Sequence, residues 1–402
     1  MNQIERSDAR HSPAGGETIS LYIHIPFCRT LCTYCAFNRY TGLEDLIDPY
    51  VTALLQEMKL IARTSSYPLK AHTLYLGGGT PSLLAPEHVA SIIAAAQEYF
   101  HLAAGAEVSL EANPGERGKL SVFRSAGVTR LSLGVQSTQP SELRLFGRRH
   151  TVQEAAEAFR LARAADFASV SIDLIYGAPW QTLRSWHETL RAILAWAPDH
   201  ISLYSLSIEP GTALYRGVQR GVLPAPDPDL AAAMYEEASL RLEQAGLKQY
   251  EISNWARPGH ECQHNCQYWR NAPYLGFGAG AHGSVTGLRY WNVRPVPRYL
   301  TRIGEGVMKR FPLSPAMEGF EVISKTLAMA ETMILGLRLV KEGVRKADFA
   351  KRFGQQPEEV FGPALRKLER AGLLMTHGDA IRLTKRAYLI SNRVFVEFLP
   401  EN

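Results

Sequence analysis

The sequence predicts an α/β protein, a partial (β/α)6 barrel followed by a C-terminal helical module of winged-helix-like shape. Short apolar runs of β-forming residues alternate with amphipathic segments of helical period between about residues 20 and 210. This order repeats six times and then stops, which predicts a curved parallel sheet short of the eight units of a full barrel. The 402 residues, 46% of them hydrophobic, suffice for one large domain and a smaller one.

Each predicted unit pairs an apolar strand with the amphipathic segment that follows it. The predicted strands cover residues 20–27, 72–79, 107–114, 130–137, 169–177 and 200–208. The predicted helices lie near residues 45–63, 86–99, 117–126, 152–166 and 182–196. Because chemistry gathers at the carboxyl ends of parallel strands, we expect the functional site at that edge.

The chain divides into four predicted parts. Residues 1–18 are rich in Ser, Gly, Pro and charge, which predicts a disordered tail. Residues 19–210 form the barrel, and residues 211–330 extend it through a more irregular stretch rich in glycine and aromatic residues. Residues 331–402 are predicted to form helices followed by a hairpin that turns around Gly378, which is typical of a winged helix.

Composition indicates a protein of a reducing compartment. No apolar run approaches the roughly 18 residues of a membrane span, and the polar start does not resemble a signal peptide. We therefore expect the cytoplasm, with at most peripheral membrane association. The 44 basic and 39 acidic residues are spread along the chain, so that any attraction to nucleic acid or anionic lipid is local. Five cysteines, an odd and small number, argue against a disulfide scaffold.

Three cysteines lie in the stretch HIPFCRTLCTYCAF, residues 24–37. Cys28, Cys32 and Cys35 could form a zinc site with His24, or could be buried free thiols. Zinc cysteines usually come as two separated pairs, however, and no second pair lies close by. We favour a 4Fe-4S cluster held by thiolates at three of its irons. The fourth iron is then open to S-adenosylmethionine (SAM), into whose sulfonium the cluster can pass an electron.

Polar or flexible residues follow several predicted strands at the same edge. They are Cys28, residues 77–80, Glu111, Gln136 and Asp173. The glycines at 77–79 would let the backbone approach a ligand closely. Glu111 and Asp173 stand in apolar strands, where a carboxylate is costly unless an arginine pairs with it or a ligand binds it. Both alternatives remain open for these two carboxylates.

The cysteine spacing is the CxxxCxxC signature of radical SAM enzymes, which the chain resembles over nearly its whole length. Further motifs resemble a haem-chaperone family within that superfamily, a relative of oxygen-independent coproporphyrinogen III oxidase. They are LYIHIPFC, YLGGGTPS, EANPG, GVQS, GRRH, IDLIYGAP and YEISNWARPGHECQHNCQYWRN. The resemblance implies a radical SAM partial barrel that binds a 4Fe-4S cluster, SAM and haem. It also implies delivery of haem to acceptor proteins such as respiratory enzymes.

The resemblance implies a set of SAM-binding residues as well. They are Tyr22, Gly79, Thr80, Glu111, Gln136, Arg148 and Asp173. Gly78, Tyr34, Ile175 and His282, which stands near the end of the glycine-rich segment YLGFGAGAH, are further candidates for the same pocket. Carboxylates suit ribose hydroxyls or an ammonium group, and Arg148 suits a carboxylate. Tyr34 and Ile175 would form apolar or aromatic walls, although each could equally belong to the core.

The segment CQHNCQYWRN carries the HNxxYW motif associated with haem chaperones. The resemblance implies a haem site made of His264, Asn265, Tyr268 and Trp269. One imidazole can serve as an axial ligand to haem iron, while an aromatic pair offers its faces to the macrocycle. The flanking Cys262 and Cys266 could add a thiolate ligand or be ordinary small residues.

Two departures separate the chain from the oxidase. The oxidase has another cysteine two residues after the third, where this chain has Phe37, and a longer N-terminal arm. Both departures favour the chaperone, with the oxidase as the alternative, and whether the protein is an enzyme is left open. Phe37 would pack beside the cluster or the adenine. The winged-helix shape raises nucleic-acid binding as a third possibility, but its basic residues alternate with acidic ones, which favours substrate or partner contact.

Overall fold

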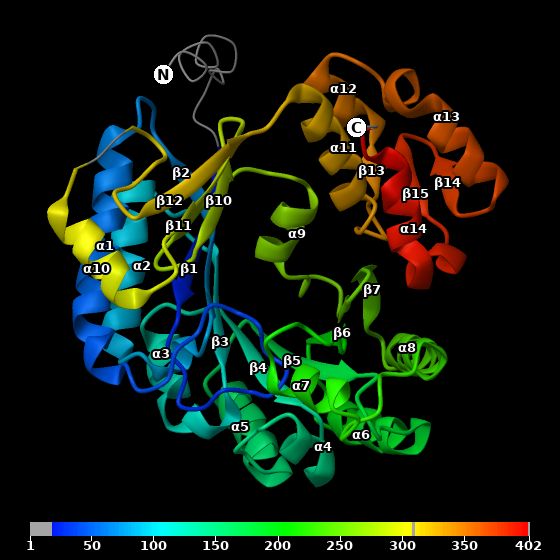
Figure 1. Ribbon diagram of the computed structural model, residues 1–402, viewed down its shortest axis with the longest axis horizontal. Helices are drawn as coiled ribbons and strands as arrows, with labels where there is room; N and C mark the ends of the chain where they lie inside the picture. Colours follow the sequence, from blue (N-terminus) through cyan, green and yellow to red (C-terminus); the bar gives the residue numbers. More distant parts are fainter. Residues whose placement is uncertain (1–17, 308–309, 401–402) are drawn as a thin grey trace.

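The computed structural model describes residues 18–307 and 310–400 (Figure 1). Of the predicted tail, residues 1–17 lie outside the described residues, and Thr18 begins the first strand. Within the described ranges, no helix combines the length and the apolar composition needed to cross a lipid bilayer.

Six parallel strands form the barrel and confirm the predicted fold class. They are β1 (Thr18–Ile25), β2 (Lys70–Gly78), β3 (Glu107–Ala112), β4 (Arg130–Gln136), β5 (Ser169–Tyr176) and β6 (His200–Ser205). Each strand pairs with the next in chain order and in parallel register. The carboxyl ends of all six strands therefore meet at one edge, where the site was expected.

The helices between the strands cover the outer face of the sheet (Figure 1). They are α1 (Ile47–Thr64), α2 (Pro86–Phe100), α3 (Leu120–Ser125), α4 (Pro140–Leu145), α5 (Val152–Ala164) and α6 (Leu183–Ala195). In α1 the buried residues Leu54, Met58 and Ile61 recur at helical spacing and pack into the core. Helix α5 begins at a capping box, in which the Thr151 side chain and the Glu154 carboxylate each accept the other's backbone N–H.

Alternate residues along each strand face opposite sides of the sheet. In β3, Val108 and Leu110 join the core beneath the helices, whereas Glu111 faces a cavity inside the barrel. The same alternation places polar residues of β2 to β6 on the inner face. They are Thr73, Tyr75, Ser109, Arg130, Ser132, Ser171, Asp173, His200 and Ser202. The strands look apolar in the sequence because the residues that face the helices are mostly Val, Leu and Ile. The residues that face the barrel interior are mostly polar.

The region 211–330 adds strands to both ends of the sheet, which has twelve strands among the described residues. The added strands are β7 (Lys248–Glu251), β8 (Asn254–Ala256), β9 (Tyr274–Phe277), β10 (His282–Val285), β11 (Leu288–Asn292) and β12 (Met317–Val322). β9 runs parallel to β1, and β8 runs antiparallel to β6. The helices of this region are α7 (Ala213–Gln219), α8 (Pro228–Gln244), α9 (Gln263–Trp269) and α10 (Val296–Glu305).

Helix α9 lies inside the curve of the sheet (Figure 1). The Glu107 carboxylate, at the start of β3, accepts the backbone N–H groups of Gln263 and His264 at the start of this helix. Because Glu107 begins its strand, α9 closes the barrel interior at the amino ends of the strands. The opposite edge, at the carboxyl ends, is left for the site.

The C-terminal module confirms the predicted winged-helix-like shape. Its elements are α11 (Lys325–Gly336), β13 (Val344–Arg345), α12 (Lys346–Phe353), α13 (Pro357–Arg370), β14 (Leu374–His377), β15 (Ala380–Leu383) and α14 (Ser391–Phe395). The hairpin of β14 and β15 turns at Gly378, whose φ of 58° is left-handed and favours glycine. The module has its own apolar core and contacts the barrel through Arg270 and Glu342, 2.7 Å apart.

Candidate functional site: two adjoining cavities

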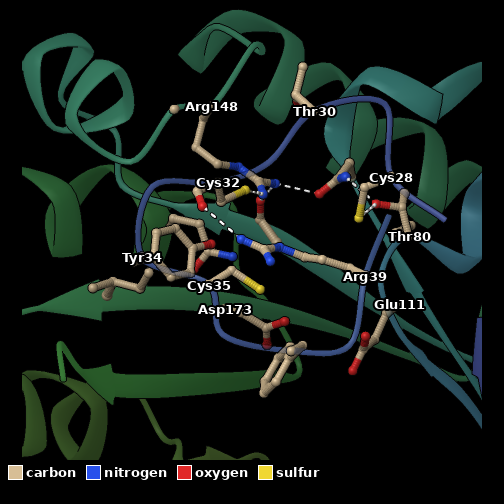
Figure 2. Close-up of a pocket in the computed structure, with 18 of the residues that line it drawn as sticks. Cys28, Thr30, Cys32, Tyr34, Cys35, Arg39, Thr80, Glu111, Arg148 and Asp173 are labelled. Carbon is tan, nitrogen blue, oxygen red and sulfur yellow. Dashed lines mark hydrogen bonds between the residues drawn. The ribbon is translucent and has the colours of Figure 1, made fainter. Parts of the chain in front are cut away.

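A cavity of about 860 Å³ opens at the carboxyl ends of the barrel strands. It collects residues that lie far apart in the sequence (Figure 2). Of the predicted site residues it contains Cys28, Cys32, Cys35, Tyr34, Gly78, Gly79, Thr80, Glu111, Gln136, Arg148, Asp173 and Ile175. Its size is that of a small-molecule site.

The three thiols stand around this cavity, and all are free (Figure 2). The Thr80 hydroxyl donates to Cys28 Sγ at 3.5 Å, and Arg148 Nη1 donates to Cys32 Sγ at 3.3 Å. Burial raises the pKa of the Cys28 and Cys35 thiols, although a hydrogen bond from Thr80 opposes this at Cys28. Hydrogen-bond donors and a guanidinium beside the sulfurs suit thiolates that hold a metal cluster.

His24 does not complete a zinc site. Its Nδ1 lies 3.0 Å from Tyr22 OH, and its Nε2 lies 2.7 Å from the Asn38 carbonyl, so both ring nitrogens are engaged. Among the described residues, no group of three His, Cys, Asp or Glu side chains could hold a metal ion. A cluster does not need such convergence on one point, because each thiolate binds a different iron.

Glu111 and Asp173, two of the carboxylates that line the cavity, have hydrogen bonds but no cation. Glu111 accepts from Tyr75 OH at 2.8 Å and from the Gly78 N–H at 3.1 Å. Asp173 accepts from the Ser132 hydroxyl at 2.9 Å and 3.0 Å. In the described structure no lysine or arginine lies within ion-pair distance of either, so the arginine alternative is wrong.

Burial is the main influence on the protonation of both carboxyls. It raises the pKa of Glu111 to about 7, and it raises the pKa of Asp173 against the lowering effect of hydrogen bonds from Ser202 and Ser132. Carboxylates held in this way are costly until a ligand supplies hydroxyl or ammonium donors.

Arg148 is fixed by several acceptors. Besides Cys32 Sγ, it donates to the Gly134 carbonyl at 2.6 Å and to the side chain of Asn113. Asn113 in turn donates to the Thr80 hydroxyl at 3.1 Å. Asn113 was not predicted, although its place in the EANPG motif at the end of β3 was a usable signal. Arg39 was not predicted either; its Nη2 donates to the Cys32 carbonyl at 3.1 Å, and the sequence offered no signal for it.

The glycine run anchors the cysteine loop. The Gly79 N–H donates to the Ile25 carbonyl and the Thr80 N–H to the Phe27 carbonyl, both at 2.8 Å. A Cβ on Gly79 would lie 2.7 Å from the Phe27 carbonyl oxygen and 2.8 Å from that of Ile25. The strand exit that carries Cys28 therefore requires glycine at position 79.

Gly79→Ala is expected to lower the free energy of unfolding by about 1–3 kcal/mol, because the new methyl group forces two backbone segments apart. It should also lower the iron content of the reconstituted protein. Urea unfolding and iron analysis measure these effects. The control is Gly118→Ala, whose Cβ would meet no atom within 4 Å. If the two variants had the same free energy of unfolding and the same iron content, position 79 would not require glycine.

A second cavity, of about 430 Å³, adjoins the first. It is lined by Tyr22, His24, Phe37, Asn38, Gly78, Glu111, Tyr268, Tyr274, Gly280, His282 and Arg294. Phe37, Gly78 and Glu111 line both cavities, so the two spaces meet there. Tyr22 and His282, predicted for the SAM pocket, line only this second cavity. Phe37 is 68% exposed at the shared rim, where its side chain lines both cavities.

The HNxxYW residues do not form one site. His264 is fully buried, and its ring nitrogens lie 2.9 Å from the Thr73 hydroxyl and 2.8 Å from Tyr268 OH. The axial-ligand interpretation of His264 does not fit this geometry, because neither nitrogen is free. Burial also lowers the pKa of His264 to about 3, so the ring is neutral.

The other motif residues point in different directions. Tyr268 lines the second cavity, whereas Trp269 lies under the Arg338 guanidinium at 4.2 Å, on the side of the C-terminal module. Asn265 is half-buried and lines neither cavity. Cys262 and Cys266 are buried thiols whose pKa values burial raises, to about 12 for Cys266, which agrees with the interpretation as ordinary small residues.

Comparison with known proteins identifies relatives that cover up to 95% of the chain. Family models match the radical SAM superfamily at residues 22–193 and the HemN C-terminal domain at residues 323–390. The heme chaperone HemW of Bacillus subtilis is 39% identical over 95% of this chain and 99% of its own. The heme chaperone HemW of Mycobacterium tuberculosis is 38% identical over 95% of each chain. The mitochondrial radical S-adenosyl methionine domain-containing protein 1 of Bos taurus is 39% identical over 81% of this chain and 76% of its own.

A solved structure shares the fold. Coproporphyrinogen III oxidase (HemN) from Escherichia coli matches with a TM-score of 0.82 and 24% identity, covering 98% of this chain and 92% of that one. The likeness confirms the partial barrel with its C-terminal module and concerns the fold alone.

Proposed function

The chain belongs to the heme chaperone HemW family of the radical SAM superfamily, and on that premise we propose that it binds a 4Fe-4S cluster, SAM and haem and delivers haem to acceptor proteins. The observation that carries the proposal is the pair of adjoining cavities. One has three free thiols and the carboxylates of Glu111 and Asp173, which have no ion-pair partner among the described residues, and the other is lined by aromatic rings. The first suits a cluster and a polar, positively charged ligand, and the second suits a flat apolar one.

In the first cavity the chain's own residues have distinct proposed roles. Cys28, Cys32 and Cys35 would hold three irons, and when bound the cluster supplies an electron to the sulfonium of SAM. Glu111 and Asp173 would accept hydrogen bonds from ammonium or hydroxyl donors of SAM. The other proposed contacts are backbone from Gly78 to Thr80, apolar walls from Tyr34 and Ile175, and polar contacts from Gln136 and Arg148.

We propose respiratory enzymes as the acceptor class and the cytoplasm as the compartment. The five free cysteines support a reducing environment. The C-terminal module, which rests on α9 and the barrel edge, is the proposed surface for substrate or partner contact, in preference to nucleic acid. In support, its cations are interleaved with acids, as in the pairs Lys346–Glu358 and Lys367–Glu397.

An anaerobic haem titration of the reconstituted protein tests the function. We expect saturable binding at a defined stoichiometry, followed by transfer that restores a haem-depleted respiratory enzyme faster than albumin-bound haem does. The counter-test supplies coproporphyrinogen III, SAM and a reductant. Turnover of that porphyrinogen without saturable haem binding would overturn the chaperone proposal.

Glu111→Gln tests the proposed SAM contact. Because the pKa of Glu111 is about 7, the carboxyl is partly protonated at neutral pH, and deprotonation favours a cationic ligand. We expect the affinity of the wild-type protein for SAM to rise between about pH 6 and about pH 8. The variant should bind on the order of tenfold more weakly at the upper end of that range, with a flatter pH profile.

Isothermal titration at several pH values measures both effects. The control is Glu98→Gln, an exposed position on α2 outside both cavities. An unchanged pH profile in Glu111→Gln would remove Glu111 from the proposed contact.

A further inference from the structure

The second cavity brings together polar and aromatic side chains from five parts of the chain. Tyr22 comes from β1, Tyr268 from the end of α9, Tyr274 from the start of β9, His282 from the start of β10, and Arg294 from just beyond β11. The Tyr268 and Tyr274 rings meet edge to face at 4.8 Å. The cavity is therefore largely aromatic, with two imidazoles, His24 and His282, and one guanidinium beside the carboxylate that it shares with the first cavity.

Three histidines stand in or near this cavity, and they differ in whether their nitrogens are free. His24 is engaged by Tyr22 OH and the Asn38 carbonyl, and His264 by the Thr73 hydroxyl and Tyr268 OH. Among the described side chains, none hydrogen-bonds to His282. Its ring stacks on Trp291 at 6.1 Å and 30°, which orients the imidazole without using a nitrogen. His282 alone of the three can donate a nitrogen lone pair to a ligand.

Arg294 supplies a free cation to the same cavity. In the part of the chain that the structure describes, no carboxylate forms an ion pair with its guanidinium. Its backbone is held in place, because its carbonyl accepts hydrogen bonds from Asn38 Nδ2 and Tyr40 OH, both at 3.1 Å. A free guanidinium on a fixed backbone suits a carboxylate of the ligand.

The segment that carries His282 is itself anchored in the core. The Ala279 N–H donates to Tyr50 OH at 2.9 Å, and the Gly278 N–H donates to the buried Glu57 carboxylate at 2.8 Å. A Cβ on Gly276 would lie 1.8 Å from the His282 carbonyl oxygen, so glycine there lets the two strands approach. These contacts hold the start of β10 at the edge of the cavity.

We infer that the second cavity is the haem site, with His282 as an axial ligand to the haem iron and Arg294 paired with a propionate. The inference rests on the proposed haem function and locates it away from His264. Neutral imidazole is a common haem ligand, aromatic rings pack against the macrocycle, and a carboxylate-bearing edge needs a cation. Because Phe37, Gly78 and Glu111 line both cavities, haem would lie next to the SAM pocket.

Haem titration of His282→Ala tests the inference, with absorbance in the Soret region and at longer wavelengths as readouts. We expect the Soret maximum to shift and the dissociation constant to rise on the order of tenfold or more, because a ligand is lost. Added imidazole should restore the wild-type spectrum. His264→Ala should keep the wild-type Soret position, and Arg294→Gln should weaken binding with the Soret position unchanged.

The matched control is His377→Ala, an exposed histidine on the hairpin of the C-terminal module. It should bind haem as the wild-type protein does. Iron and sulfide analysis checks that each variant keeps its cluster. If the wild-type protein binds haem saturably and His282→Ala matches it in affinity and spectrum, the inference is overturned while the proposed function stands. If the wild-type protein shows no saturable binding, both are overturned.

Discussion

Cys32→Ser is expected to abolish the 4Fe-4S cluster, with iron and sulfide falling to background after anaerobic reconstitution. The hydroxyl of serine has a much higher pKa than a thiol and stays protonated, so it does not replace the thiolate. The irons of the cluster also prefer sulfur to oxygen as a ligand. The loss should be complete because only three thiols line the cavity, so removing one leaves two. Absorbance of the reconstituted protein should lose its charge-transfer bands in parallel.

Cys266→Ala is the control for the loss of a cysteine as such. Cys266 is buried against Tyr250, Ala256 and Leu339, outside both cavities, and no ligand role is assigned to it. This variant should keep its cluster. Full 4Fe-4S occupancy in Cys32→Ser would refute the assignment of the cavity.

Glu57→Ala is expected to lower the free energy of unfolding by about 3–5 kcal/mol. The buried carboxylate of Glu57 accepts from Gly278 N–H, Asn292 Nδ2 and Tyr299 OH at 2.8 Å, and from Ser314 Oγ at 2.6 Å. Alanine would remove the acceptor of these four hydrogen bonds, of whose donors Asn292 Nδ2 keeps the Gly278 carbonyl as an acceptor, and would leave a cavity. The urea midpoint of unfolding measures the loss.

The same variant should also weaken haem binding, because Glu57 anchors the segment that leads to His282. The control Glu98→Ala removes an exposed glutamate from α2 and should change stability by no more than about 0.5 kcal/mol. A Glu57→Ala protein as stable as this control would show that the hydrogen bonds at Glu57 contribute little. If Glu57→Ala loses stability but keeps its affinity for haem, the hydrogen bonds at Glu57 stabilise the fold without positioning the haem site.

Local pattern was enough to predict the barrel. The six strands and five of the helices between them follow from alternating apolar runs and amphipathic segments, and their observed ends differ from the predicted ones by a few residues, whereas the short helix α4 was not predicted. The edge with Cys28, Glu111 and Asp173 was also predictable, because parallel strands bring their carboxyl ends together. The barrel and the position of its functional edge depend on the spacing of apolar residues within each segment and on the order of strands and helices that this spacing implies.

The added strands of region 211–330 were not predicted. They are three to six residues long, and three of them include a glycine, Gly276, Gly283 or Gly319, so they are too short for alternation to mark them as strands. Their pairing depends on the existing edges of the barrel: β9 joins β1 and β8 joins β6. A short strand of this kind forms because an edge is available to it.

The sequence by itself determined the partial barrel, the three-cysteine loop and the edge where the first cavity opens. Only the tertiary structure decided that Tyr22 and His282 belong to a second cavity, and that His264 is buried with both nitrogens engaged. The reason is physical: whether a side chain is free to bind a ligand depends on its hydrogen-bond partners, and these come from distant segments. Thr73 lies 191 residues from His264 in the chain and 2.9 Å from its ring.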